Sequence, residues 1–135
     1  IREAQEDEFE NLTLSFLDPD SFRERFSDVV HGEEAWGATQ YWYYTATNEI
    51  YSAAIGYRTD IPQTDRNSII LEEIVNTLGI SDSGRRSDSI VYQYSNDNLQ
   101  LSEIDWLLLE LLYHPDIACG MDAEMCEKVI RDLYY

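Results

Sequence analysis

Histidine and basic residues are scarce in this chain. Of its 135 residues, two are histidine and nine are lysine or arginine, whereas 27 are aspartate or glutamate, and the formal net charge is −18. A surface that binds nucleic acid or an anionic membrane needs clustered lysine and arginine side chains to neutralise phosphate groups. We therefore expect no nucleic-acid partner and no direct contact with an anionic membrane surface.

Long apolar runs are missing too. The longest, Trp106 to Leu109, is far shorter than the roughly 20 residues of a membrane-spanning helix, so we expect no membrane insertion by this fragment. The length and the 44% content of hydrophobic residues fit one domain over residues 1–135, with residues 1–10 frayed. Because the chain starts with Ile1 rather than methionine, we expect that an N-terminal part of the full protein precedes it, with any signal peptide or lipid anchor.

Several catalytic motifs are also absent. The chain has no G-x-S-x-G nucleophile turn, no P-loop and no G-x-G-x-x-G dinucleotide fingerprint. A cysteine nucleophile would need Cys119 or Cys126 to meet His31 or His114, and no motif supplies the residue that would orient the histidine. These enzyme classes are therefore not expected.

One segment has the spacing of a zinc-protease helix without its histidines. In the motif H-E-x-x-H, two imidazoles four residues apart bind one zinc ion, and the intervening Glu acts as general base. Here Glu72 and Asn76 occupy the two histidine positions, and Glu73 occupies the position of the base. Gly79 stands where the extended motif ends its helix, and Asp82 stands where a third ligand would follow.

This segment has two interpretations. Imidazole is the usual nitrogen donor for zinc, whereas carboxylate and amide oxygens suit harder cations. We therefore expect no zinc and no cofactor, and a calcium-like ion is the metal that these oxygens could hold. In the first interpretation the segment is the remnant of a metal site. In the second it is the exposed acidic face of an amphipathic helix with a glycine C-cap.

The sequence that follows resembles the metzincin proteases. Three patterns occur in order: the run Ser89-Ile90-Val91-Tyr92, the pair Leu101 and Asp105 at the start of an apolar helix, and Leu112-Tyr113 at its end. In metzincins the zinc helix is followed by a turn of the type Ser-x-Met-Tyr and then by a helix with these features. Val91 stands here where the turn has methionine. The resemblance implies a zincin-like (metzincin-type) fold, in which Tyr92 belongs to the remnant site.

The chain is more closely similar to a large bacterial family of secreted or lipid-anchored domains of unknown function. Residues 45–135 carry the resemblance, through a Glu-Glu-Leu-Thr-Gln-x-Leu-Gly run and a later Leu-Leu-x-Leu-Leu-Tyr-Asp-Pro run. This sequence has Ile74-Val75-Asn76 for Leu-Thr-Gln and His114 for Asp. The resemblance implies an extracytoplasmic protein. It also favours a disulfide between Cys119 and Cys126, which their spacing alone leaves open against two unpaired, buried thiols.

Periodicity predicts an α+β domain with a small mixed sheet, a hairpin and three main helices. The expected elements are a strand at 12–16, a short helix with Asp18 as N-cap, Pro19 at its first position and Phe22 and Phe26 inward, a hairpin of 39–45 and 50–57, and helices at 68–78, 102–113 and 122–134. In the helix at 102–113, Ser102 as N-cap and Asp105 three residues later are expected to form a capping box. Residues 60–67 read as a polar loop. The helix at 102–113 is apolar nearly all round, so we expect it to be the central buried helix.

Aromatic residues are concentrated in the predicted hairpin, at positions 41–44 and 51. Consecutive residues of a strand face opposite ways, so half of them could lie in the core. The alternative is an exposed surface that recognises sugars or peptides.

Two functions from different classes follow. The first is an extracytoplasmic, degenerate metalloprotease-like pseudoenzyme that binds or scaffolds an unknown protein, peptide or glycan. The second is a metal-dependent hydrolase or peptidase that keeps Glu73 as general base, with Glu72, Asn76 and Asp82 as ligands.

Overall fold

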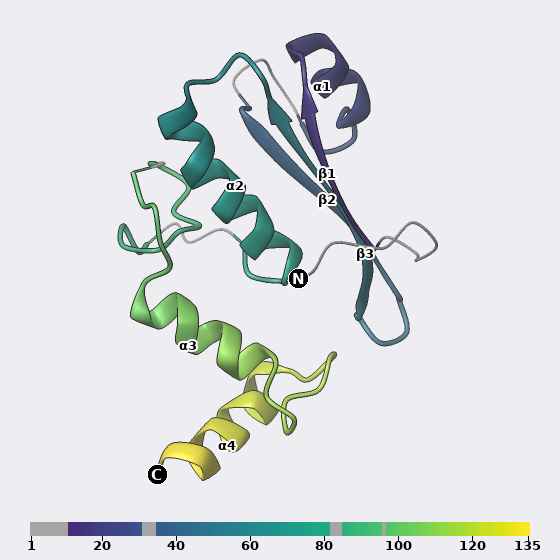
Figure 1. Cartoon of the computed structure of the whole chain (residues 1–135). Coiled ribbons are helices and arrows are strands. Elements are labelled where there is room, and N and C mark those ends of the chain that lie inside the picture. The colour runs from purple at the N-terminus through teal and green to yellow at the C-terminus, as the bar shows by residue number, and fades with distance from the viewer. Residues whose placement is uncertain (1–10, 31–34, 82–84, 96) are drawn as a thin grey trace.

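The computed structural model describes residues 11–30, 35–81, 85–95 and 97–135 (Figure 1). The elements are β1 (Leu12–Leu17), α1 (Pro19–Arg25), β2 (Gly37–Tyr43), β3 (Ile50–Arg58), α2 (Gln63–Thr77), α3 (Glu103–Leu112) and α4 (Ala123–Tyr134). The predicted α+β class, the hairpin and the three main helices are confirmed. The prediction that residues 1–10 are frayed lies outside the described residues.

The sheet has three strands in the order β1-β3-β2. Strand β1 runs parallel to β3, with Leu14 opposite Ile55, and β2 pairs antiparallel with β3 as a hairpin, with Thr39 opposite the same Ile55. The sheet is therefore mixed, as predicted. In the hairpin turn Asn48 adopts φ 60°, a left-handed conformation that asparagine tolerates better than most residues.

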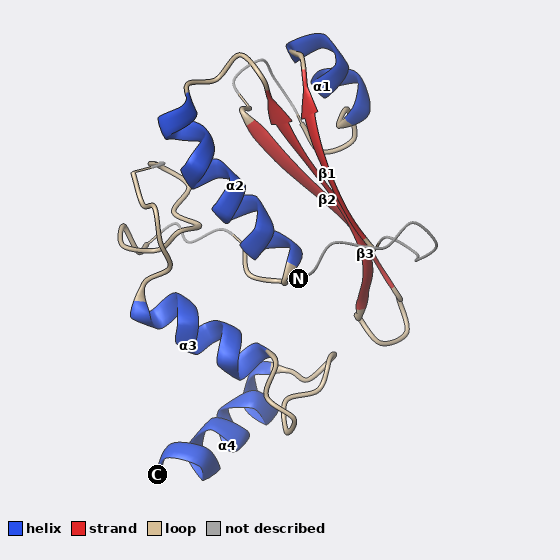
Figure 2. Ribbon diagram, viewed as in Figure 1, coloured by secondary structure: helices blue, strands red, loops and turns tan. Residues whose placement is uncertain are grey.

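Helix α1 covers one face of the sheet (Figure 2). Asp18 caps it by accepting from the backbone N–H of Ser21 at 3.1 Å, and Pro19 occupies the first turn. Phe22 and Phe26 are buried against the sheet, as predicted. Gly56 on β3 makes room for them, because a Cβ atom there would lie 2.2 Å from the Phe26 ring.

Helix α2 covers the opposite face. Ile55 and Tyr57 of β3 are fully buried against Ile69 of the helix. The helix begins at Gln63, so the prediction of a loop over residues 60–67 is wrong for residues 63–67. The first turn of α2 is mostly polar and exposed, and apolar periodicity cannot detect a helical turn that has no apolar face.

The chain that follows α2 packs on the side of the helix away from the sheet. Val75 of α2 is buried together with Ile90 and Val91, in a third cluster separate from the two that line the sheet. Helix α2 is therefore held between the sheet and the turn at 89–92. The helix ends at Thr77 with Leu78 as its C-cap, and the next residue, Gly79, has a φ of 97°, which gives the helix-ending turn that the sequence predicts.

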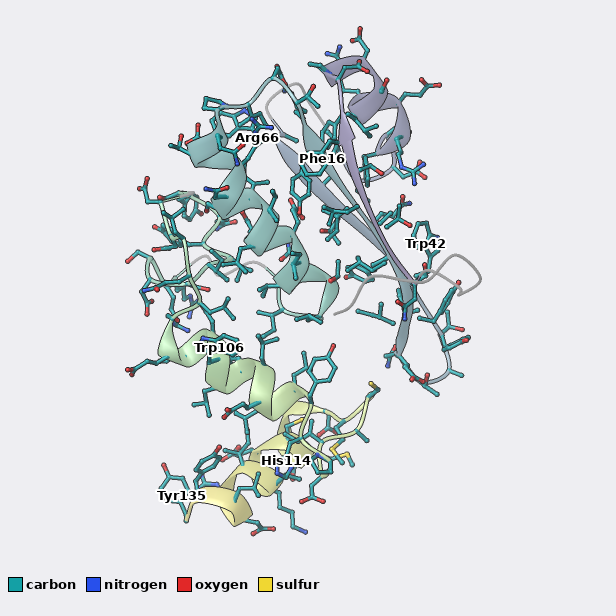
Figure 3. The ribbon with its side chains drawn as sticks, in the orientation of Figure 1. Phe16, Trp42, Arg66, Trp106, His114 and Tyr135 are labelled. Atoms are coloured by element: carbon teal, nitrogen blue, oxygen red, sulfur yellow. The ribbon has the colours of Figure 1, made fainter. Side chains whose placement is uncertain are left out.

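The prediction that the helix at 102–113 is the central buried helix is wrong. Of the ten residues of α3, all of them described, only Asp105 is buried. Trp106 is 58% exposed, and α3 and α4 lie beyond the C-terminal end of α2, away from the sheet (Figures 1 and 3). The central position is taken by α2, since the sheet buries that helix directly. Among the described residues, no helix combines the length and apolar character needed to cross a membrane.

Candidate functional site

Glu73 lies on the face of α2 that packs against strand β2, and its side chain is buried. The hydroxyl of Thr39 donates to Glu73 Oε2 at 2.5 Å, and Asn76 Nδ2 donates to the same oxygen at 3.2 Å. The spacing of three residues between Glu73 and Asn76 places them on neighbouring positions of the helix surface. The carboxylate is therefore bound both to its own helix and to the edge strand.

A glycine on β2 makes this close approach sterically feasible. A Cβ atom at Gly37 would lie 2.4 Å from Ile69 Cγ2 and 2.9 Å from Glu73 Oε1. Any larger residue would have to displace the side chains of Ile69 and Glu73, or shift the helix that carries them. On the sheet, Gly37 therefore leaves space for the Glu73 side chain, and Thr39 donates a hydrogen bond to it.

Burial dominates the electrostatics of this site. It raises the pKa of Glu73, and the hydrogen bonds from Thr39 and Asn76 oppose that shift. It also raises the pKa of the half-buried Glu72 to about 7, with the charge of Glu73 as a second cause. The pKa of Tyr57 is raised by burial and then by both glutamates, and its hydroxyl donates to the carbonyl of Ile70 at 3.1 Å.

The other predicted site residues are distributed as follows. Glu72, Glu73 and Asn76 share α2, as predicted, whereas Asp82 lies outside the described residues. Tyr92 is half-buried in the turn on the opposite side of α2 from the sheet, where its ring meets that of Tyr94 edge-on at 5.5 Å between centroids. Within the described ranges, no three His, Cys, Asp or Glu side chains are placed to hold one metal ion.

Asp105 has a role that the sequence only partly predicts. The capping box with Ser102 is confirmed. In addition, the buried carboxylate accepts from Ser89 Oγ at 2.7 Å and from the backbone N–H of Ile90 at 2.9 Å. Burial alone would raise the pKa of Asp105, but the hydrogen bonds from Ile90, Ser89 and Ser102 hold it below its usual value. Asp105 therefore fixes the turn at 89–92 to the start of α3.

Comparison with family models decides the relationship of the chain to known proteins. Residues 1–132 match the model described as protein of unknown function, DUF2927. The chain belongs to this family. The match confirms membership in a family of unknown function, whereas the zincin-like fold, the bacterial source and the secreted location stay predictions. No curated protein and no solved structure matches the chain.

A groove of about 770 Å³ lies at the C-terminal end of α2 in this DUF2927 domain, a few residues beyond Glu73 and Asn76. We call it the hairpin groove; it is bounded by the hairpin tip, the C-terminal end of α2 and the loop between α3 and α4. Its lining residues are Tyr41, Tyr43, Asn48, Glu49, Ile50, Leu78, Gly79, Leu112, Tyr113, His114, Pro115, Ile117, Cys119 and Gly120. The hydroxyl of Tyr113 donates to the carbonyl of Leu78 at 3.2 Å, which joins the ends of α3 and α2.

The aromatic residues of the hairpin are on the surface of the domain. The exposed fractions at positions 41–44 and 51 range from 41% to 55%, so the prediction that half of them lie in the core is wrong. Trp42 points away from α2 (Figure 3), whereas Tyr41 and Tyr43 share the other face of β2, with ring centroids 6.3 Å apart. Sequence periodicity could not tell buried from exposed aromatic residues here. It gives the face of a strand on which a side chain lies, but it does not say how far along the strand a helix covers that face.

The two cysteines of the DUF2927 domain are unpaired in the structure. Cys119 is exposed in the lining of the hairpin groove, and Cys126 is half-buried on α4. The disulfide that the resemblance favours is therefore not formed. The alternative of two unpaired, buried thiols is right about the pairing and wrong about the burial, since neither thiol is buried.

Proposed function

We propose that this DUF2927 domain is a non-catalytic binding domain built on a degenerate zincin-like frame. The observation that carries the proposal is the position of Glu73. A general base must reach a water molecule or a substrate proton within hydrogen-bond distance. Glu73 is buried instead, with Oε2 bound by Thr39 and Asn76 and Oε1 facing Gly37. A carboxylate used in this way holds a helix to a sheet.

The arrangement around α2 supports the zincin-like frame. The helix with the remnant motif packs on the sheet, and the turn that stands in the place of the metzincin Met-turn packs on its other side through Val75 and Val91. Asp105 then fixes that turn to the next helix. With the resemblance, this order favours an extracytoplasmic bacterial domain, secreted or lipid-anchored, whose partner is a protein, a peptide or a glycan.

A second candidate is a metal-dependent hydrolase in which Glu73 is the base and Glu72, Asn76 and Asp82 are ligands. The pKa of about 7 at Glu72 favours it, because strongly shifted carboxyl groups are concentrated at functional sites. Burial in an ordinary packed helix gives the same shift, and burial is its first cause here.

Metal content and hydrolysis separate the two candidates. The domain is purified without chelator, its metal content is measured by elemental analysis, and it is incubated with an unstructured protein substrate. We expect no stoichiometric metal and no cleavage. One metal ion per chain, together with cleavage that Glu73→Gln abolishes, would replace the binding proposal with the hydrolase.

A further inference from the structure

We propose that the hairpin groove binds a lysine or arginine side chain of a basic peptide segment. The inference rests on the proposed binding function and names the class of ligand and the place where it binds. It depends on three features of the groove: aromatic walls, negative potential and an apolar floor.

Three tyrosine side chains line the groove. Tyr41 and Tyr43 stand side by side on β2 with an angle of 49° between their rings, and they are 44% and 48% exposed. Tyr113, at the end of α3, is 64% exposed and also lines the groove. Two or three tyrosine rings around one space attract a cation electrostatically, because the face of an aromatic ring is negative.

The fixed charges of the groove have the same sign. Glu49 contributes a carboxylate, and none of the described residues that line the groove is lysine or arginine. Leu78 and Tyr113 are the C-caps of α2 and α3, so two helices end at the groove. The C-terminal end of a helix carries a partial negative charge, which favours cations and disfavours anions.

The floor of the groove suits the stem of a long basic side chain. Ile50, Leu78, Leu112 and Ile117 supply apolar surface. Lysine and arginine cover such surface with their methylene groups while the charged end stays in a polar environment. Gly120 places the loop between α3 and α4 beside the hairpin turn, since a Cβ atom there would lie 3.6 Å from Asn48 Nδ2.

The net charge of the whole chain favours one class of ligand for the hairpin groove over the others. At a net charge of −18, a second copy of the domain, an anionic polysaccharide or a phosphorylated segment is repelled over a wide approach, and a basic segment is attracted. A neutral glycan would stack on tyrosine rings but would gain nothing from Glu49 or the helix ends. The observations therefore favour the basic peptide.

The test is an NMR titration of the ¹⁵N-labelled domain with capped glycine pentapeptides that carry one central residue. The lysine and arginine peptides are expected to bind saturably, to shift the amide signals of Gly79 and Gly120, and to bind more weakly at high salt. The norleucine peptide, which keeps the methylene stem without the charge, is expected to bind about tenfold more weakly. Chitotriose and cellotriose serve as neutral glycan probes.

Substitutions inside and outside the hairpin groove test whether the lysine peptide binds there. Tyr43→Ala and Glu49→Gln should each weaken lysine-peptide binding severalfold, while Tyr94→Ala, which removes an exposed tyrosine outside the groove, should leave it unchanged. Equal binding of the norleucine and lysine peptides, preference for a glycan, or no binding by any probe overturns the inference. Each of these results leaves the non-catalytic proposal standing, because that proposal is tested by metal content and hydrolysis.

Discussion

The hydroxyl of Thr39 donates a hydrogen bond of 2.5 Å to the carboxylate of Glu73, and this bond joins the edge strand β2 to helix α2. The two residues are 34 positions apart in the chain. The carboxylate stands at the position that the zinc-protease motif reserves for its general base. Its partner is a strand hydroxyl, and this pairing is the observation behind the proposal that Glu73 has a structural role.

Thr39→Val should destabilise the domain by about 1–3 kcal/mol, because it leaves a buried carboxylate with one donor fewer while keeping the shape of the side chain. The melting temperature should fall by roughly 5–10 °C. Thr39→Ser, which keeps the hydroxyl, should lose less. Glu73→Gln should also lower the melting temperature, because the bond from Thr39 then ends on a neutral amide. Since burial raises the pKa of Glu73, this loss should become smaller as the pH rises and the buried carboxylate of the parent ionises. Unchanged melting of Thr39→Val and Glu73→Gln would mean that the site is a solvated surface.

Glu72 should make stability fall as the pH rises. Its folded-state pKa of about 7 is above the ordinary value of 4.5, so between these pH values the folded chain keeps a proton that the unfolded chain has released. The contribution is fully present below pH 4.5 and is lost as the pH rises through about 7. Glu72→Gln should therefore stabilise the domain at pH 8 on the order of 2 kcal/mol.

Chemical denaturation of parent and variant at pH 5 and pH 8 measures this difference. Glu110→Gln on the exposed side of α3 is the control, and it should show the same pH dependence as the parent. A Glu72→Gln variant that keeps the parental difference between the two pH values would place the titrating group elsewhere.

Asp105→Asn should release the turn at 89–92 from α3. The amide cannot accept on both sides as the carboxylate does, so the donors at Ser89 and Ile90 lose part of their bonding, at a cost of about 2–4 kcal/mol. Because the folded pKa of Asp105 is lowered, the parent's stabilisation is present above pH 3.8 and is lost as the pH falls through the folded value.

Hydrogen exchange at the amide of Ile90 reports this release. It should become faster in Asp105→Asn and stay unchanged in Asp88→Asn, a variant of an exposed carboxylate that pairs with Arg86 nearby. Equal protection of Ile90 in all three proteins would show that the turn is held by its apolar contacts alone.

Restoring both histidines tests the inherited frame. Glu72→His with Asn76→His places two imidazoles four residues apart on α2, which is the spacing that binds one zinc ion. The double variant should bind zinc measurably by calorimetry. The parent should show no saturable binding in the micromolar range, and Glu72→His alone should bind far more weakly than the pair. A double variant that binds no better than the parent would mean that α2 is not a zinc-protease helix.

The sequence predicts the hairpin, the N-cap at Asp18 and the capping box at Ser102 correctly, because each depends on residues that are close together in the chain. It also places Glu72, Glu73 and Asn76 on one helix. It misses the partners of Glu73 and Asp105, since Thr39 and Ser89 reach these carboxylates only after distant segments pack together.

The exposure of α3 is a second feature that the sequence could not predict. An apolar composition indicates that the helix must cover its surface somewhere, but it does not say which helix the sheet takes as its neighbour. In this protein α2 occupies that place, because its Ile69 and Glu73 fit against Gly37 and the residues beside it on the sheet. Trp106 of α3 then stays exposed.

The sequence by itself determined the element types, their caps, the acidic surface and the absence of a paired-histidine motif, because these follow from composition and from spacing along one chain. The tertiary structure alone decided that Glu73 is buried and pinned by Thr39, that the hairpin tyrosines are exposed, and that two helix ends meet at one groove. Each of these depends on which surfaces pack against one another. Packing is set by the shape and volume of residues far apart in sequence, which no local pattern records.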